Sequence, residues 1–353
     1  MSEATTVNDG GPDVALKPEG YAARLTAWAA AYPWALPAGA ALVGILARLW
    51  LVAHTHAMLD GDEAMIGLQA ERILHGQFPT YFYGQAYMGT LEAYLAAPVV
   101  ALLGPTGWAL RLVPIILLPL LVYLTWRLAR AVLPGDATTT PLLAGLAACV
   151  AGLPPLYVVI TEMRTWGGQI EVYVITLALL LCVVELADRL RAGASTAELL
   201  RRWLVLGFVA GLGIWINPLI AYALVAAVLW LLLPLAGRVA PGRFPGAPAR
   251  AAAGATWGLA ALAPALALLP GLLIGGLPAW LYAAQHSGEN LLVYVSQPTV
   301  DLAASGAARH GRLFLGAAIT VRYFTCVAPN VLDGRLPTES ALLLPLRLLL
   351  LAP

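Results

Sequence analysis

Three carboxylates lie close together in the segment Asp60-Gly-Asp62-Glu63. Charged residues make up only 11% of this 353-residue chain, and hydrophobic stretches lie on both sides of the segment. Charge is costly to hold beside a membrane, so a cluster of this kind indicates a functional site. A carboxylate that stays ionised there could serve as a general base or as a metal ligand.

The three acids have different expected roles at the start of a helix. The pattern predicts a helix from Asp60 to His75, with Asp60 as its N-cap and Glu63 as its partner in a capping box. Capping is therefore an alternative to chemistry for both residues. Asp62 has no capping duty, and the helix dipole favours its ionised form. Asp62 is therefore the first candidate for a catalytic base or for a ligand of a divalent metal.

Tyrosines follow this helix in the sequence. A second helix is expected from about Tyr87 to Leu103, lying along the membrane interface and containing Glu92. Tyrosines are common in the aromatic belts of membrane proteins, and a belt is one reading of these residues. The other is a pocket for a sugar or a lipid phosphate, and the candidates for lining it are Tyr81, Tyr83 and Tyr87.

A second acidic element runs from Glu162 to Glu171, and both ends of it are further acidic candidates. Gly167 and Gly168 stand where a hydrophobic span begins, and the free N–H groups of a helix N-terminus form a ready anion site. Arg164 beside them could grip a phosphate through paired hydrogen bonds. Glu171, about one turn inside the membrane, needs a partner, a proton or water.

Simpler roles stay open for the same residues. Arg164 could extend toward a lipid headgroup. Arg111, at the start of another span, could bind a donor phosphate or anchor at a headgroup. Glu171 could form a buried ion pair with Arg48 or Arg322.

The elements that must position these residues are membrane-spanning helices. The chain is 60% hydrophobic with a mean hydropathy of +0.80, and apolar runs of about 20 residues recur along it. We therefore predict an all-α polytopic membrane protein with about 8–9 transmembrane helices. The expected spans cover residues 33–53, 106–130, 141–161, 168–187, 203–217, 219–235, 253–275 and 313–331, and a ninth begins near 341.

The arginines predict the orientation of these spans. Those after the second, fourth and sixth spans fall on one side, and the positive-inside rule makes that side cytoplasmic. Residues 1–32 are then a cytoplasmic tail, expected to be disordered, and residues 54–105 form the first outer loop. The membrane domain covers 33–353. Its end within an apolar run at Pro353 suggests a piece of a longer protein.

Short motifs lie along the first outer loop and the start of the next span. They are Asp62-Glu63-Ala64, Ile73-Leu-His-Gly76, Phe78-Pro79, Tyr94-Leu-Ala-Ala-Pro98, Leu102-Leu-Gly-Pro105 and Ala109-Leu-Arg-Leu112. This series resembles bacterial members of glycosyltransferase family 39, in the GT-C superfamily of polytopic membrane enzymes. That family includes protein mannosyltransferases and the aminoarabinose transferases of lipid A. The resemblance is fairly specific over residues 60–130 and weaker from there to about 290.

The resemblance implies a GT-C fold whose large first outer loop carries interfacial helices. It implies transfer of a sugar, with inversion, from a polyprenyl-phosphate donor to an acceptor hydroxyl at the outer face of the cell membrane. The acceptor would be a protein, a lipid or a glycan. The catalytic or metal-binding role falls on Asp62, with Glu63 beside it, and a second acidic role on Glu171 or Glu162. Met65 departs from the family, where many members carry an aromatic or basic residue.

Two other functions fit the sequence. A transporter or lipid flippase would place charges or broken helices near the bilayer midplane and would have related halves, but no internal repeat is found. A truncated, non-catalytic scaffold would account for the abrupt end. The sequence has no basic-aromatic pattern for nucleic acid, no Gly-rich phosphate loop with Lys and no His-Glu-x-x-His motif.

Overall fold

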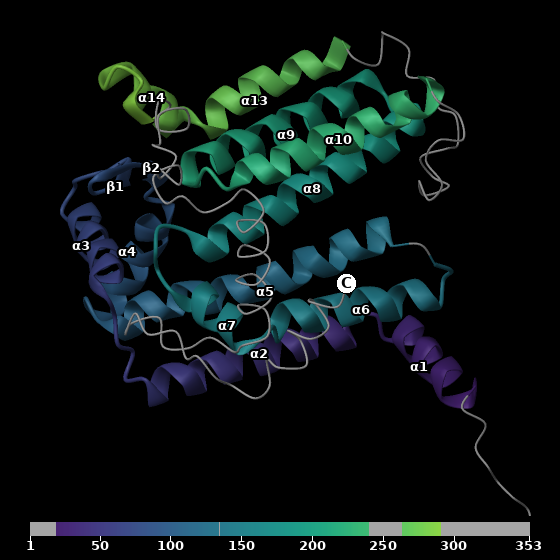
Figure 1. Cartoon of the computed structure of the whole chain (residues 1–353), viewed down its shortest axis with the longest axis horizontal. Coiled ribbons are helices and arrows are strands. Elements are labelled where there is room, and N and C mark those ends of the chain that lie inside the picture. The colour runs from purple at the N-terminus through teal and green to yellow at the C-terminus, as the bar shows by residue number, and fades with distance from the viewer. Residues whose placement is uncertain (1–18, 134, 240–262, 291–353) are drawn as a thin grey trace, which may run out of the picture.

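A computed structural model of the chain describes residues 19–133, 135–239 and 263–290, which are mostly helical. Long helices lie side by side, and a small hairpin with shorter helices covers one end of them (Figure 1). Within the described ranges, four helices are long and apolar enough to cross a membrane. They are α2 (Ala35–His54), α5 (Gly107–Val132), α8 (Gln169–Arg191) and α9 (Thr196–Ile216).

Two further apolar segments are bent. α6 (Thr139–Gly152) and α7 (Leu156–Met163) meet at 65°, and two successive prolines lie between them, where a helix cannot continue. η1 (Ala263–Ala267) and α13 (Leu268–Gly275) meet α14 (Leu277–Gln285) at the same angle. If each bent pair is one span, the described residues hold up to six spans.

The prediction of a helical membrane protein is confirmed in this coarse form. The described residues give four to six spans, so the count of 8–9 is not reached within them. The predicted spans at 313–331 and from 341 lie outside the described residues. The predicted boundary between the spans 203–217 and 219–235 is present, because α9 ends at Ile216 and α10 (Ile220–Val239) begins just after it.

Two local predictions are wrong. Residues expected to belong to a disordered tail form α1 (Glu19–Ala31). The helix expected from Tyr87 begins later, as α4 (Leu91–Leu103), because Tyr87 lies in a strand.

That strand belongs to a hairpin inserted between α3 (Gly61–Leu74) and α4. β1 (Tyr81–Phe82) and β2 (Gln85–Gly89) pair antiparallel, a feature that the all-α prediction lacked. Gly84 in the turn has a φ of +81°, a conformation that glycine adopts without strain. The hairpin is anchored to the bundle, since the Trp215 indole N–H of α9 donates to the Thr80 carbonyl at 2.9 Å.

Glycines let α9 and α13 approach until their backbones touch. A Cβ atom on Gly207 would lie 2.1 Å from the Leu268 carbonyl oxygen, and one on Gly275 would lie 2.0 Å from that of Phe208. Small residues four apart on each helix are typical of close packing between helices in membranes. These residues are Gly207 and Gly211 on α9, and Gly271 and Gly275 on α13.

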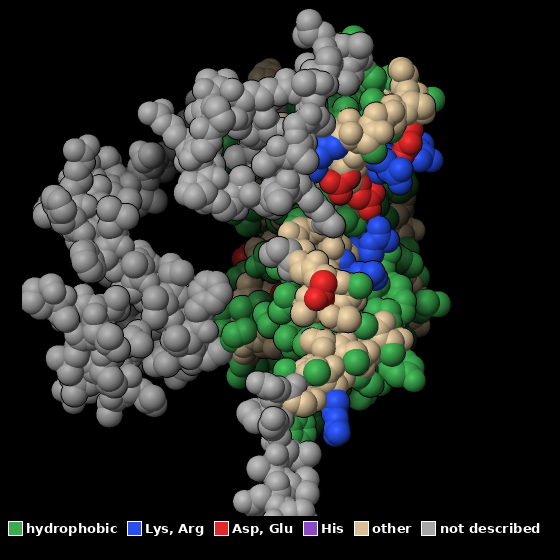
Figure 2. Space-filling model, turned by 90° about the vertical axis from the view of Figure 1, so that its right-hand side faces the viewer, with side chains coloured by type: hydrophobic (Ala, Val, Ile, Leu, Met, Phe, Trp, Pro, Cys, Tyr) green, Lys and Arg blue, Asp and Glu red, His purple; other side chains and the backbone are tan. Residues whose placement is uncertain are grey.

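The two ends of the bundle differ in their charged groups. The hairpin end carries the acidic loop, and the opposite end faces the viewer in Figure 2, where basic and acidic side chains are interspersed. The ion pairs described at that opposite end are Arg127–Glu185, Arg202–Glu185, Arg202–Glu198, Arg189–Glu198 and Arg191–Asp188. The arginine-rich connections and the first outer loop therefore lie at opposite ends. The assignment of these ends to cytoplasm and exterior stays a prediction.

Candidate functional site at the hairpin end of the bundle

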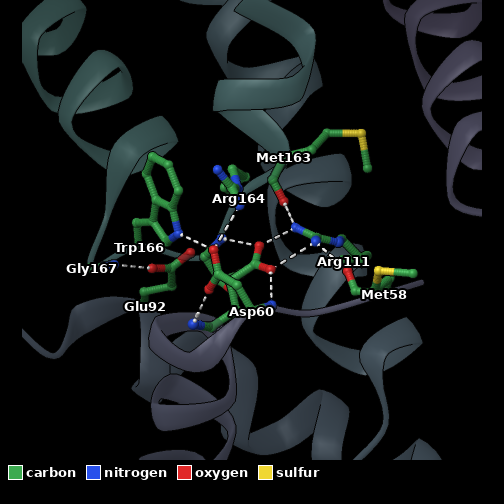
Figure 3. Close-up of polar contacts among 10 residues, drawn as sticks. Met58, Asp60, Glu92, Arg111, Met163, Arg164, Trp166 and Gly167 are labelled. Atoms are coloured by element: carbon green, nitrogen blue, oxygen red, sulfur yellow. Dashed lines mark hydrogen bonds and ion pairs between the residues drawn. The ribbon is translucent and has the colours of Figure 1, made fainter. Parts of the chain in front are cut away.

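Several helices start at the hairpin end, and their polar side chains converge there. The starts of α3, α4, α5 and α8 meet the segment 164–168, which joins α7 to α8. Asp60, Glu92, Arg111 and Arg164 point toward this common region in Figure 3. The structure therefore brings the two acidic elements of the sequence into one site.

Asp60 and Glu63 form the predicted capping box of α3. The Glu63 backbone N–H donates to Asp60 Oδ1 at 3.0 Å, and the Asp60 N–H donates to Glu63 Oε2 at 2.9 Å. Each side chain thus satisfies a donor that the helix start leaves free. The capping role is confirmed for both residues, although both also bind partners outside the helix.

Glu63 is fully buried and forms an ion pair with Arg111 of α5. Both guanidinium Nη atoms donate to the carboxylate, with Nη2 at 2.9 Å from Oε2. Arg111 also donates to the carbonyls of Met163 at 2.6 Å and Met58 at 2.7 Å (Figure 3). Its side chain is only 11% exposed. A donor phosphate would therefore have to compete with Glu63 for Arg111.

Asp60 makes a second ion pair, with Arg164. Arg164 Nη2 lies 2.7 Å from Asp60 Oδ2, and the Trp166 indole N–H donates to the same oxygen at 2.9 Å. The Arg164 guanidinium also stacks on the Trp166 ring at 3.8 Å, a cation–π contact. Partial burial acts to raise the pKa of Asp60. The Glu63 N–H, the indole and the guanidinium outweigh it and hold that pKa below its usual value.

Acid should therefore weaken this part of the site. A lowered pKa gives stability that is fully present above the unfolded value of 3.8 and is lost as the pH falls through the folded value. We expect the wild type to lose more thermal stability than Asp60→Asn as the pH drops below 3.8. Asparagine keeps the N-cap but has no charge to lose. Thermal unfolding in detergent measures the melting temperature of both proteins as a function of pH. An equal fall in melting temperature for both proteins below this pH would contradict the expectation.

Asp62 differs from its two acidic neighbours in having no partner. It lies in the first turn of α3 and is exposed. Within the described part of the chain, its carboxylate makes no hydrogen bond or ion pair. Of the three carboxylates at this helix start, Asp62 is therefore the one that is free to meet a ligand, since Asp60 is paired with Arg164 and Glu63 with Arg111.

The helix start predicted to bind an anion is already filled by a side chain of the protein. The N–H groups of Gly167 and Gly168 at the start of α8 both donate to Glu92 Oε2, each at 2.8 Å. Glu92 comes from α4 and is 1% exposed. Burial and the nearby Glu171 carboxyl act to raise the pKa of Glu92, whereas the two N–H groups act to lower it. These amides are therefore not free to bind a phosphate, and the prediction of an anion site there is wrong.

Glu171 is buried in the first turn of α8, at 2% exposure. Neither carboxylate oxygen has a hydrogen-bond partner on another residue in the described part of the chain. Oε2 lies beside Gly168, 3.8 Å from the position that a Cβ atom there would take. The carboxyl groups of Glu92 and Glu171 therefore both lie near Gly168.

Glu162 pairs with Arg48, so the proposed pairing of Arg48 with Glu171 is wrong. Arg48 Nη2 lies 2.5 Å from Glu162 Oε2, and both side chains are almost fully buried. Arg48 Nη1 also donates to the Gly152 carbonyl at 2.9 Å. Glu162 is thus committed to this buried ion pair. Arg322, the alternative partner for Glu171, lies outside the described residues.

The three candidate tyrosines lie in different surroundings. Tyr81 is buried, and its hydroxyl accepts from Asn290 Nδ2 at 2.9 Å. The Tyr83 hydroxyl accepts from Arg72 Nη1 at 3.3 Å, and the ring carries that guanidinium at 5.1 Å. Tyr87 is half-buried on β2. Tyr83 and Tyr87 are accessible enough to line a pocket, whereas Tyr81 belongs to the packed interior.

The described residues do not supply a metal centre. Among them, no three His, Cys, Asp or Glu side chains gather as a set that could hold a metal ion. A hard cation such as Mg²⁺ or Ca²⁺ takes several oxygen ligands. Asp62 offers a single carboxylate, so the donor set found here does not fit a divalent metal at Asp62.

Sequence reasoning gave no site role to Glu92 or Trp166. One signal for Glu92 was present: two glycines at the start of α8 expose two N–H groups, which need an acceptor. The sequence could not say which acid would supply it, because Glu92 is 75 residues away from Gly167.

Comparisons with protein-family models, with curated proteins and with solved structures found no match for this chain.

Proposed function

We propose that this chain is a membrane glycosyltransferase that takes a sugar from a polyprenyl-phosphate donor and passes it to an acceptor hydroxyl. The observation that supports it best is the position of Asp62. This exposed carboxylate lies at one end of a membrane-type helix bundle, two residues after Asp60, which pairs with the one-third exposed Arg164. A base and a cation at the same end of the bundle suit a donor whose lipid stays in the membrane.

Asp62 would act as the general base. It would take the proton of the acceptor hydroxyl while the acceptor oxygen forms a bond to the anomeric carbon. The bond between that carbon and the phosphate oxygen would break, and its electron pair would leave with the polyprenyl phosphate. Attack from the face opposite the phosphate inverts the anomeric configuration.

Arg164 would stabilise the departing phosphate. Its side chain is more exposed than that of Arg111, at 33% against 11%, and it is fixed by Asp60 and Trp166. Fixed cations stabilise developing negative charge without having to reorganise during the reaction. Arg111 would not bind the phosphate, because its donors are taken by Glu63 and by two carbonyls. It would instead hold Glu63 in position. Tyr83 and Tyr87 would border the sugar.

A second candidate function, a transporter or flippase, is favoured by a different observation. The buried Arg48–Glu162 pair lies where the α6–α7 segment is bent, and a second apolar segment is bent by the same angle. Broken helices and buried charges mark many transport pathways. Movement of a labelled polyprenyl phosphate across proteoliposomes, without sugar transfer, would support this alternative.

The test of the enzyme is sugar transfer in membranes. Wild type, Asp62→Asn and a control, Asp188→Asn, are compared with labelled polyprenyl-phosphate sugars and membrane acceptors. Asp188 is a half-exposed acid at the opposite end of the bundle. We expect Asp62→Asn to lose about 100-fold or more of the transfer rate, as loss of a general base does, while the control keeps the wild-type rate.

Two results would count against the proposal. Equal transfer by wild type and Asp62→Asn would remove Asp62 from the mechanism. Absence of transfer from every donor by a folded wild-type chain would argue against the enzyme itself.

A further inference from the structure

Glu92 and Glu171 form a buried pair of acids with no cation assigned to them. They are 1% and 2% exposed, and both lie against Gly168. The nearby arginines are committed elsewhere: Arg111 pairs with Glu63 and Arg164 pairs with Asp60. Within the described residues, the pair therefore meets backbone N–H groups and another acid, but no neutralising side chain.

Two adjacent carboxylates cannot both stay ionised in such a place. Burial disfavours the charged form of each group, and the like charge of its neighbour disfavours it further. A further negative charge, Glu63 on α3, also acts on Glu92, although Arg111 balances it. Binding of one proton relieves the repulsion without requiring any new group to enter the buried space.

Hydrogen bonding decides which acid holds the proton. Glu92 accepts from two backbone N–H groups, and such bonds stabilise a carboxylate. Glu171 has no hydrogen-bond donor from another residue in the described part of the chain. Its ionised form therefore has no bonds to replace those that water would supply. Protonation turns one of its oxygens into a donor, which is available to the Glu92 carboxylate beside the same glycine. The two groups then titrate as a pair.

We propose that Glu92 and Glu171 form a proton-binding site in which one proton is shared and resides on Glu171. The site is distinct from the exposed Asp62 and does not depend on the proposed transferase activity. It adjoins that site structurally, because Glu92 holds Gly167 and Gly168, and the neighbouring residues Arg164 and Trp166 hold Asp60. Loss of the proton would place a second charge beside Gly168 and loosen the 164–168 segment.

Infrared spectroscopy of the purified chain in detergent tests the proposal. A protonated carboxylic acid has a carbonyl stretching band that is separate from the bands of carboxylates and shifts in D₂O. Wild type at neutral pH should show such a band, and labelling of the glutamate carboxyl carbons with ¹³C should move it. Raising the pH should remove it. Absence of a glutamic acid band from wild type at neutral pH would overturn the proposal before any variant is made.

Two variants then place the proton. Glu171→Gln removes the proton-bearing group and should abolish the band, since Glu92 keeps its two donors and stays ionised. Glu92→Gln should keep the band, because Glu171 remains buried without a donor. A control on α3, Glu71→Gln, changes a partly exposed acid and should leave the band unchanged.

The asymmetry between the variants is the decisive result. A band that survives Glu171→Gln, or one that is lost in both variants, would contradict placement of the proton on Glu171. The amide of glutamine is the neutral equivalent of the protonated acid, so Glu171→Gln should fold. Failure of this variant to fold would also count against a neutral Glu171.

Discussion

Replacing Arg48 by Met should lower the free energy of unfolding by about 3–5 kcal/mol, because it leaves a buried carboxylate without its partner. The Arg48 and Glu162 side chains are 1% and 5% exposed, so water cannot take over the role of the guanidinium. Arg48 also donates to the Gly44 and Gly152 carbonyls, and these bonds would be lost as well. Denaturant titration in detergent micelles measures the loss.

Two comparisons separate the loss of this pair from a general effect of removing an arginine. Arg127→Met breaks an ion pair with Glu185 whose side chains are 42% and 37% exposed, and it should cost about 0–1 kcal/mol. The double variant Arg48→Met/Glu162→Met should recover much of the stability, because two apolar side chains replace the pair together. An Arg48→Met loss no larger than that of Arg127→Met would contradict the importance of the buried pair.

The second large effect is expected where α9 and α13 touch. Gly211→Ala should destabilise the chain by about 1–3 kcal/mol, the range found when atoms are forced into packed interiors. The new Cβ atom would lie 2.3 Å from the Leu272 carbonyl oxygen and 2.6 Å from the Gly276 nitrogen. Both are backbone atoms, so the helices must separate to admit the methyl group.

Gly39→Ala is the matched control. Gly39 is also helical, in α2. Apart from its chain neighbours and the backbone of its own helix, no heavy atom lies within 4 Å of the added Cβ. Alanine is the better helix former by about 0.5–1 kcal/mol, so this variant should be slightly stabilised. Opposite signs for Gly211→Ala and Gly39→Ala in the same unfolding assay would establish the backbone contact. A loss of unfolding free energy in both variants would show that the effect at Gly211 does not come from the contact between the two backbones.

Features that depend on nearby sequence could be predicted for this chain. The capping box of α3 is one example, because Asp60 and Glu63 lie within one helical turn of each other. The long apolar helices are another, since length and hydropathy suffice to indicate them. The hairpin escaped prediction because its strands are only two and five residues long.

Choices among distant partners could not be predicted in the same way. Arg48 was considered as a partner of Glu171, but packing selected Glu162, which is 114 positions away. Arg111 and Arg164 were expected to be open to a ligand, but each is paired with an acid of the first outer loop. Residue type indicated that these groups carry the chemistry of the site. The distances between helices decide which of them neutralise one another.

The bend between α6 and α7 is braced from outside by a single side chain. Arg48 holds the Gly152 carbonyl at the end of one arm and the Glu162 carboxylate near the end of the other. α7 is therefore tied to α2 both at the bend and near its far end, so the direction of α7 follows the position of α2. The free end of the second arm leads directly into Arg164, which grips Asp60. A small tilt of α2 in the bilayer would therefore move α7 and Arg164, and with them Asp60 at the start of α3.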